Sequence, residues 1–155
     1  MVTTLREEIK QTKPFTSLEQ EAQLSVIRTG AMLMDEIEQF LRPYEITATQ
    51  YNVLRILRGA EPNGLCRNEL RDRMLTRMPD MTRLLDRMEE AGLVTRQRST
   101  ADRRLVTTQI TKKGRQIVDD LDEAADDQHE KALGHMSEQQ LRTLIKLLTI
   151  ARSQE

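Results

Sequence analysis

Residues 67–111 read RNELRDRMLTRMPDMTRLLDRMEEAGLVTRQRSTADRRLVTTQIT, and the spacing of their apolar side chains changes at Gly92. Before Gly92 the apolar residues recur every three or four positions, which predicts two successive helices, about Arg67–Met74 and about Arg77–Ala91. After Gly92 the period falls to two, which predicts a β-hairpin over 94–110. Gly92 itself is predicted to end the second helix in a left-handed C-cap.

The rest of the chain shows the helical period. Apolar residues from Ser17 onward predict one long amphipathic helix, which Pro43 ends, preceded by an arm with at most a short helix. A further helix is expected up to Gly59, and two more follow the hairpin. The fold class is therefore mainly α with a small β-hairpin wing, that is, a winged helix-turn-helix domain with additional helices on both sides. The residues predicted to cap its helices are Thr47, Thr76, Thr111 and Ser137.

Length and composition limit the class of protein. With 155 residues, 37% apolar and 32% charged, we expect a soluble chain with one main core. It has no run of about 18 apolar residues, so no membrane span is expected, and its N-terminus does not resemble a signal peptide. A single cysteine excludes an intrachain disulfide and is typical of a reducing compartment. We expect a cytoplasmic protein.

Charge is unevenly distributed along the chain although the net charge is only −1. Residues 67–115 contain eleven arginines, two lysines and seven acids, which gives a local net charge of +6. Between residues 119 and 140, eight acids face one lysine, a net charge of −7. A basic lobe beside an acidic helix favours a protein with one face directed at phosphates.

The second helix of the pair is the candidate for insertion into the major groove of double-stranded DNA. Arginine can bind guanine, threonine can contact the thymine methyl, and aspartate can accept a hydrogen bond from cytosine. The alternative is a solvated helix face, on which Asp80 favours the positive end of the helix dipole. For Arg87 we expect a phosphate contact or an internal pair instead of a base contact. The candidate contacts on this helix are Arg77, Asp80, Thr82, Arg83 and Arg87.

The hairpin turn carries a second group of candidates. Asp102, Arg103 and Arg104 stand at the expected tip, from which arginine can enter a narrow minor groove. A carboxylate repels phosphate, so Asp102 is interpreted as the paired partner that orients an arginine. The alternative is an ordinary charged turn.

At these residues the sequence resembles the MarR family of bacterial regulators. The stretch 81–96, MTRLLDRMEEAGLVTR, is similar to the family's recognition helix and first wing strand. The acid and two arginines at 102–104, followed by ITKKG at 110–114, are similar to its wing signature. Both motifs occur at the family's separation. The helix order and the chain length match the family too, so the resemblance covers about residues 17–152.

The resemblance implies an obligate homodimer, and the unpartnered apolar helix faces agree with it. It divides the chain into an N-terminal arm and dimerisation helix (1–44), a winged helix-turn-helix DNA-binding lobe (45–112) and C-terminal dimerisation helices (113–155). Two copies would bind a pseudo-palindrome with half-sites about one helical turn apart. Arg104 is then the minor-groove residue and Asp102 its support. The implied function is a repressor that a small-molecule effector releases from its operator.

The resemblance also implies an effector cleft between the dimerisation helices and the DNA-binding lobe, suited to small aromatic or amphipathic compounds. Tyr44 and Tyr51 are the predicted lining residues, because only four aromatic side chains are present. Cys66 is interpreted as a buried or capping residue rather than a redox sensor. The two histidines, His129 and His135, do not share a helix face and lack a cysteine cluster, so no metal site is predicted.

Two other classes of function compete with DNA binding. An enzyme has little support, because no phosphate-binding, dinucleotide-binding, zinc-protease or nucleophile-elbow motif is present, and no cofactor is predicted. A helical module that binds protein instead of DNA is the remaining alternative, and the arginines retained along 77–104 argue against it.

Overall fold

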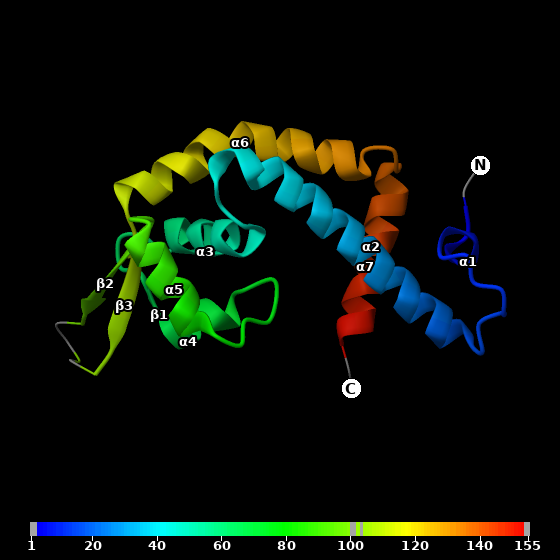
Figure 1. The fold of residues 1–155 in the computed structure, drawn as a ribbon, viewed down its shortest axis with the longest axis horizontal. Coiled ribbons are helices and arrows are strands. Elements are labelled where there is room, and N and C mark those ends of the chain that lie inside the picture. Colours follow the sequence, from blue (N-terminus) through cyan, green and yellow to red (C-terminus); the bar gives the residue numbers. More distant parts are fainter. Residues whose placement is uncertain (1–2, 100–101, 103, 154–155) are drawn as a thin grey trace. The chain divides into compact units, whose positions relative to one another are not determined.

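The structure is a computed structural model, which describes residues 3–99, 102 and 104–153. The chain forms two compact units, residues 1–39 and 40–155. The elements, in chain order, are α1 (Leu5–Glu8), α2 (Leu18–Leu41), the 3-10 helix η1 (Arg42–Tyr44), α3 (Ala48–Gly59), β1 (Leu65–Cys66), α4 (Arg67–Asp72), α5 (Met81–Glu90), β2 (Val94–Arg98), β3 (Val106–Ile110), α6 (Lys112–Leu133) and α7 (Glu138–Arg152) (Figure 1).

The first unit holds α1 and most of α2. Helix α1 is one turn long and begins with a capping box, in which the Thr4 N–H donates to Glu7 Oε2 at 2.8 Å. The long helix predicted from Ser17 to Pro43 is confirmed as α2. Along it, Leu18 is 81% exposed and Val26 is 52% exposed. Burying such side chains is favourable, so α2 has apolar surface that its own chain leaves in water.

The core of the second unit lies where α3, α5 and α6 meet the sheet. Helix α3 begins at the predicted capping box, in which Thr47 Oγ1 accepts the Gln50 N–H at 3.1 Å. Its apolar residues repeat at helical spacing, so one face of the helix can be buried. The fully buried side chains of this core include Leu54, Leu57, Leu70, Leu85, Met88, Val94, Val118 and Leu121.

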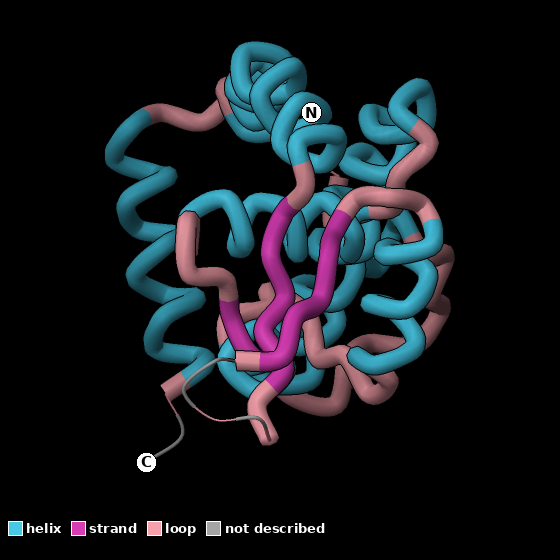
Figure 2. The backbone as a smooth tube through the Cα atoms, turned by 90° about the vertical axis from the view of Figure 1, so that its left-hand side faces the viewer, coloured by secondary structure: helices cyan, strands magenta, loops and turns pink. Residues whose placement is uncertain are grey.

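The sheet contains the predicted hairpin and one strand more. β2 and β3 pair antiparallel with Val94 opposite Ile110, and the tube view shows them beside the short strand β1 (Figure 2). Leu65 of β1 pairs with Thr108, giving the order β1-β3-β2 within the described residues. The two-stranded prediction missed β1 because two residues are too few to show a period. Gly92, which precedes the hairpin, has φ +73° as predicted.

The second helix of the pair starts later than predicted. Helix α5 begins at Met81 and Asp80 is its N-cap, so placing the start at Arg77 and the cap at Thr76 was wrong. Pro79 explains the difference, because a proline disfavours the helical conformation in the residue before it, here Met78. Arg77 therefore lies in the connection between α4 and α5.

Helices α6 and α7 begin at their predicted caps. Thr111 Oγ1 accepts the Gly114 N–H at 3.1 Å, and Ser137 forms a capping box with Gln140. On α7, Ile145 and Ile150 are 63% and 58% exposed. None of the helices in the described part of the chain combines the length and apolar character that a membrane span requires.

Candidate nucleic-acid interface

Helix α5 separates buried apolar residues from exposed polar ones. Met81, Leu85 and Met88 are buried against the core. Thr82, Arg83 and Arg87 are exposed, as the 3.6-residue period requires. Neither Arg83 nor Arg87 has an ion pair with another described residue. The outer face of α5 is therefore available to a partner.

The start of α5 is fixed by Asp80. Its Oδ1 accepts the Arg83 N–H at 3.0 Å, which satisfies one of the N–H groups that have no intrahelical partner. Asp80 was predicted to contact a base, with the helix terminus as the alternative, and the structure places it at the terminus. Arg77 is exposed and precedes this cap.

Thr82 has a partner that the sequence pattern did not indicate. Arg67, the first residue of α4, donates from Nη1 to Thr82 Oγ1 at 3.0 Å. The two residues are 15 positions apart and lie on different helices. No periodic pattern predicts such a contact, because it depends on how α4 and α5 pack.

Arg96 of β2 is held inside the lobe. Its Nη2 lies 2.6 Å from Glu89 Oε2 and 2.7 Å from Asp86 Oδ1, both on α5. The Arg96 N–H also donates to Glu89 Oε1 at 3.0 Å. The side-chain hydrogen bond from Arg96 lowers the pKa of Glu89, and the backbone N–H adds to this. Arg96 therefore connects the helix to the wing, a role that the sequence analysis missed.

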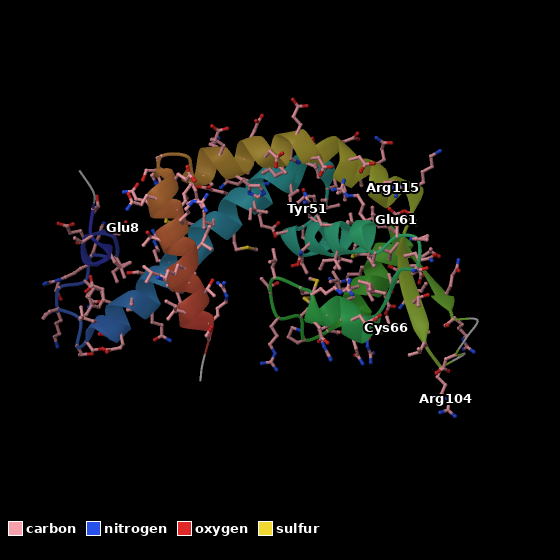
Figure 3. All side chains as sticks on the ribbon, turned by 180° about the vertical axis from the view of Figure 1, so that it is seen from behind. Glu8, Tyr51, Glu61, Cys66, Arg104 and Arg115 are labelled. Carbon is pink, nitrogen blue, oxygen red and sulfur yellow. The ribbon has the colours of Figure 1, made fainter. Side chains whose placement is uncertain are left out.

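The wing tip presents Arg104 to solvent, at the far end of the hairpin (Figure 3). Asp102 Oδ1 accepts the Arg104 backbone N–H at 2.9 Å, and the Leu105 N–H donates to the Asp102 carbonyl oxygen at 3.0 Å. A pair between the Asp102 carboxylate and an arginine side chain was expected. In the structure Asp102 supports Arg104 through the Arg104 backbone N–H instead. Arg103 lies outside the described residues.

A hollow of about 420 Å³ lies between the helix pair and the wing. Thr82 and Arg104, both predicted from the sequence, lie on its wall. The residues that line it are Cys66, Arg67, Asn68, Thr82, Leu85, Arg96, Arg104, Leu105, Val106 and Thr108. Arg96 is neutralised by Glu89 and Asp86. Arg67 and Arg104, which have no ion pair with a described residue, leave positive charge on this concave surface and favour an anionic partner.

A cluster of ion pairs around the half-buried Arg58 side chain connects α3 to α6. Arg58 Nη1 lies 2.8 Å from Asp119 Oδ1 and 2.7 Å from Asp122 Oδ2. The hydrogen bond from Arg58 lowers the pKa of Asp122, and the same contact raises the pKa of Arg58. Arg58 and these two acids therefore set the position of the lobe's first helix.

The predicted effector residues lie on neighbouring elements. Tyr51, on α3, accepts a hydrogen bond from Arg55 Nη1 at 3.2 Å, and the Arg55 guanidinium lies 5.9 Å from the ring centroid (Figure 3). Tyr44 ends η1 and is 37% exposed. No hydrogen bond joins Tyr44 to Tyr51 among the described residues. Their shared role in a cleft stays a prediction.

Cys66 is the N-cap residue of α4 and is half-buried. Its N–H donates to Glu69 Oε2 at 2.8 Å, and this backbone contact is the main cause of the lowered pKa of Glu69. The capping interpretation of Cys66 is confirmed. Within the described ranges, no group of three or more histidine, cysteine or acidic side chains is placed to hold a metal ion.

The helix pair, the hairpin and the exposed arginines define a winged helix-turn-helix protein. The MarR family model matches residues 46–106. A MarR transcription factor of known structure from Planctomyces limnophilus is 38% identical, with 88% of this chain and 99% of that chain covered and a TM-score of 0.66. The chain belongs to the MarR family, whose members are transcription regulators and not enzymes.

Two further relatives are more distant. The HTH-type transcriptional regulator FarR from Neisseria gonorrhoeae is 28% identical over 107 residues, which cover 69% of this chain and 72% of the relative. A mutant MarR from E. coli, solved in complex with operator DNA, has a TM-score of 0.79 at 23% identity and covers 97% of this chain and 100% of that chain. The E. coli likeness shows the shared fold.

Proposed function

We propose that this regulator binds double-stranded DNA sequence-specifically, as a homodimeric repressor. The observation that carries the proposal is the placement of Thr82 and Arg83 on the outer face of α5 and of Arg104 at the wing tip of the same lobe. The E. coli relative solved with operator DNA supports it. Such a protein acts where chromosomal DNA is accessible, and we propose the cytoplasm.

Helix α5 enters the major groove in this proposal. Its exposed Arg83 and Thr82 provide contacts to guanine and to the thymine methyl, and Arg77 approaches from the preceding connection. Arg87 lies one turn further along and contacts a phosphate. Arg104 enters the minor groove, whose negative potential is strongest where A·T tracts narrow it. Base contacts then give specificity and phosphate contacts give register.

A second copy of the chain covers the exposed apolar side chains. Val26 and Ile27 of α2, and Ile145 and Ile150 of α7, are each more than half exposed. Apolar surface of this extent on terminal helices favours a large, hydrophobic interface. A twofold dimer then requires a pseudo-palindromic operator with half-sites about one turn of DNA apart.

Release of the operator is proposed to follow effector binding near Tyr44 and Tyr51. A small aromatic or amphipathic compound that binds only the conformation with mismatched half-site spacing shifts the population away from the DNA-binding form. A coupling of about 1–3 kcal/mol between the two ligands is enough for a 5- to 150-fold change in affinity.

The test is DNA binding by the purified full-length chain. The protein is mixed with a pool of random duplexes and the bound sequences are recovered. The affinity of the wild-type protein for the selected duplex is then compared with that of the Arg104→Ala variant. We expect the variant to bind at least about tenfold more weakly, because a minor-groove contact is lost. Affinity should also fall steeply with salt, since phosphate contacts release counterions.

Arg142→Ala is the charge-matched control. Arg142 is exposed on α7 and pairs with Glu138, four residues away, so its loss should leave DNA affinity unchanged. If Arg104→Ala and the wild type bind the selected duplex with equal affinity, Arg104 does not contact DNA. Absence of duplex binding at low salt would overturn the function and favour the protein-binding module.

A further inference from the structure

The contact between Arg67 and Thr82 joins the two helices of the helix-turn-helix at the surface proposed to meet DNA. Arg67 Nη1 donates to Thr82 Oγ1 at 3.0 Å. Both residues are exposed, and both line the hollow that Arg104 also lines. Arg67 has no ion pair with any residue in the described ranges. Within the part of the chain that the structure describes, its guanidinium has one hydrogen-bond partner, Thr82 on the groove-facing helix.

A hydrogen bond to the Thr82 hydroxyl also fixes the position of the Thr82 methyl group. The hydroxyl and the methyl share Cβ, and χ1 of threonine has only a few staggered positions. An arginine that holds the hydroxyl toward α4 therefore selects among these positions before DNA arrives. A side chain ordered in advance loses less entropy when it binds.

We propose that Arg67 is a positioning residue, which holds Thr82 so that its methyl group contacts the C5 methyl of one thymine in each half-site. The inference rests on the proposed DNA-binding function and deepens it, because it names a base and the residue pair that selects it. Thymine is the base that presents a methyl group in the major groove. Thr82 makes the contact and Arg67 sets its geometry.

Deoxyuridine is the probe for this contact, since it removes the thymine methyl and keeps every hydrogen-bonding group. In the duplex selected by the wild-type protein, each thymine of the half-site is replaced in turn by deoxyuridine. We expect one position at which affinity falls about fourfold, the change for burial of one methyl group. In Arg67→Ala we expect this preference to fall below about twofold.

Three variants separate the roles within the pair. Thr82→Ser keeps the hydroxyl and loses the methyl, so the thymine preference should disappear. Thr82→Val keeps a methyl and loses the acceptor, so adding Arg67→Ala should change nothing further. Arg71→Ala removes another arginine of α4, one outside the lining of the hollow, and it should keep the full preference. Melting temperatures of all variants establish that the fold is intact.

A direct phosphate contact by Arg67 gives a different result. Arg67→Ala would then weaken thymine and deoxyuridine duplexes equally and reduce the slope of log affinity against log salt by about one. That outcome overturns the inference, as does a wild-type protein with no thymine-specific loss at any position. In both cases duplex binding remains, so the proposed function stands; only a protein that binds no duplex removes both.

Discussion

The two acids among the candidate interface residues have a common local role. Asp80 Oδ1 accepts the Arg83 N–H at 3.0 Å, and Asp102 Oδ1 accepts the Arg104 N–H at 2.9 Å. Each carboxylate is thus bonded to the backbone of an arginine that we propose contacts DNA. A carboxylate near phosphate is repelled, whereas a carboxylate bonded to N–H groups holds a helix start or a turn in place.

Gly114 is required where α6 leaves the sheet. A Cβ at this position would overlap the Leu93 carbonyl oxygen and lie 3.0 Å from Leu54 Cδ2. Gly114→Ala should therefore lower the free energy of unfolding by about 2 kcal/mol, the cost of an overpacked core, as measured by urea denaturation.

Gly59→Ala is the matched control for this prediction. Gly59 ends α3, and no atom lies within 4 Å of an added Cβ. Because alanine has the higher helix propensity, this variant should be at least as stable as the wild type. A Gly114→Ala protein of wild-type stability would show that α6 can move away from the sheet at little cost.

The connection between recognition helix and wing depends on one arginine and two acids. Arg96 on β2 bonds Glu89 and Asp86 on α5, so the hairpin and the helix are held as one body. Asp86 and Glu89 are neighbours on one helix face, three positions apart. The bidentate fork of arginine allows it to bind both.

The stability contributed by Glu89 should be lost in acid. Its folded pKa lies below the unfolded value of about 4.3, so its contribution is present above that pH and declines as the pH falls through the folded pKa. Glu89→Gln should unfold at lower urea than the wild type at pH 7, and the difference should narrow at about pH 3.

Glu90→Gln serves as the comparison. Glu90 is the adjacent acid on α5 and has no ion pair with a described residue, so its removal should change stability little at either pH. A Glu89→Gln deficit as large at pH 3 as at pH 7 would mean that packing, and not the ion pair, connects α5 to β2.

The two ends of the chain share an excess of exposed apolar surface. Leu18, Val26 and Ile27 on α2, and Ile145 and Ile150 on α7, are all more than half exposed. A soluble monomer rarely leaves long apolar helix faces in water. In the proposed dimer, a second copy of the chain covers these residues on both helices.

Ile150→Glu should convert the proposed dimer to a monomer, because it places a charge in an apolar interface. Sedimentation equilibrium measures the change directly, and the melting temperature should lose its dependence on protein concentration. DNA affinity should fall when the dimer is lost, because a single lobe reaches only one half-site.

Thr149→Glu introduces the same charge at an exposed polar position of the same helix, about 100° around the helix axis from Ile150. It should remain dimeric. If Ile150→Glu also sediments as a dimer, the face of α7 that carries Ile150 does not form the interface.

The hydrophobic period predicted the order of the helices and the hairpin, because burial requires one apolar face per element. Chain features without a period were missed: the two-residue strand β1, and the start of α5, which Pro79 moved to Met81. The caps at Thr47, Thr111 and Ser137 were predicted because their partners lie three residues away.

Local sequence thus specified most of the elements, where most of them begin, and that the basic charge gathers in one lobe, since these properties depend on neighbours along the chain. Packing between elements decided the surroundings of four arginines: Arg96 and Arg58 are held by acids of another element, Arg67 holds Thr82, and Arg104 faces water. A guanidinium donates to a carboxylate or hydroxyl oxygen within about 3 Å. Between separate elements, that distance is set only when they fold together.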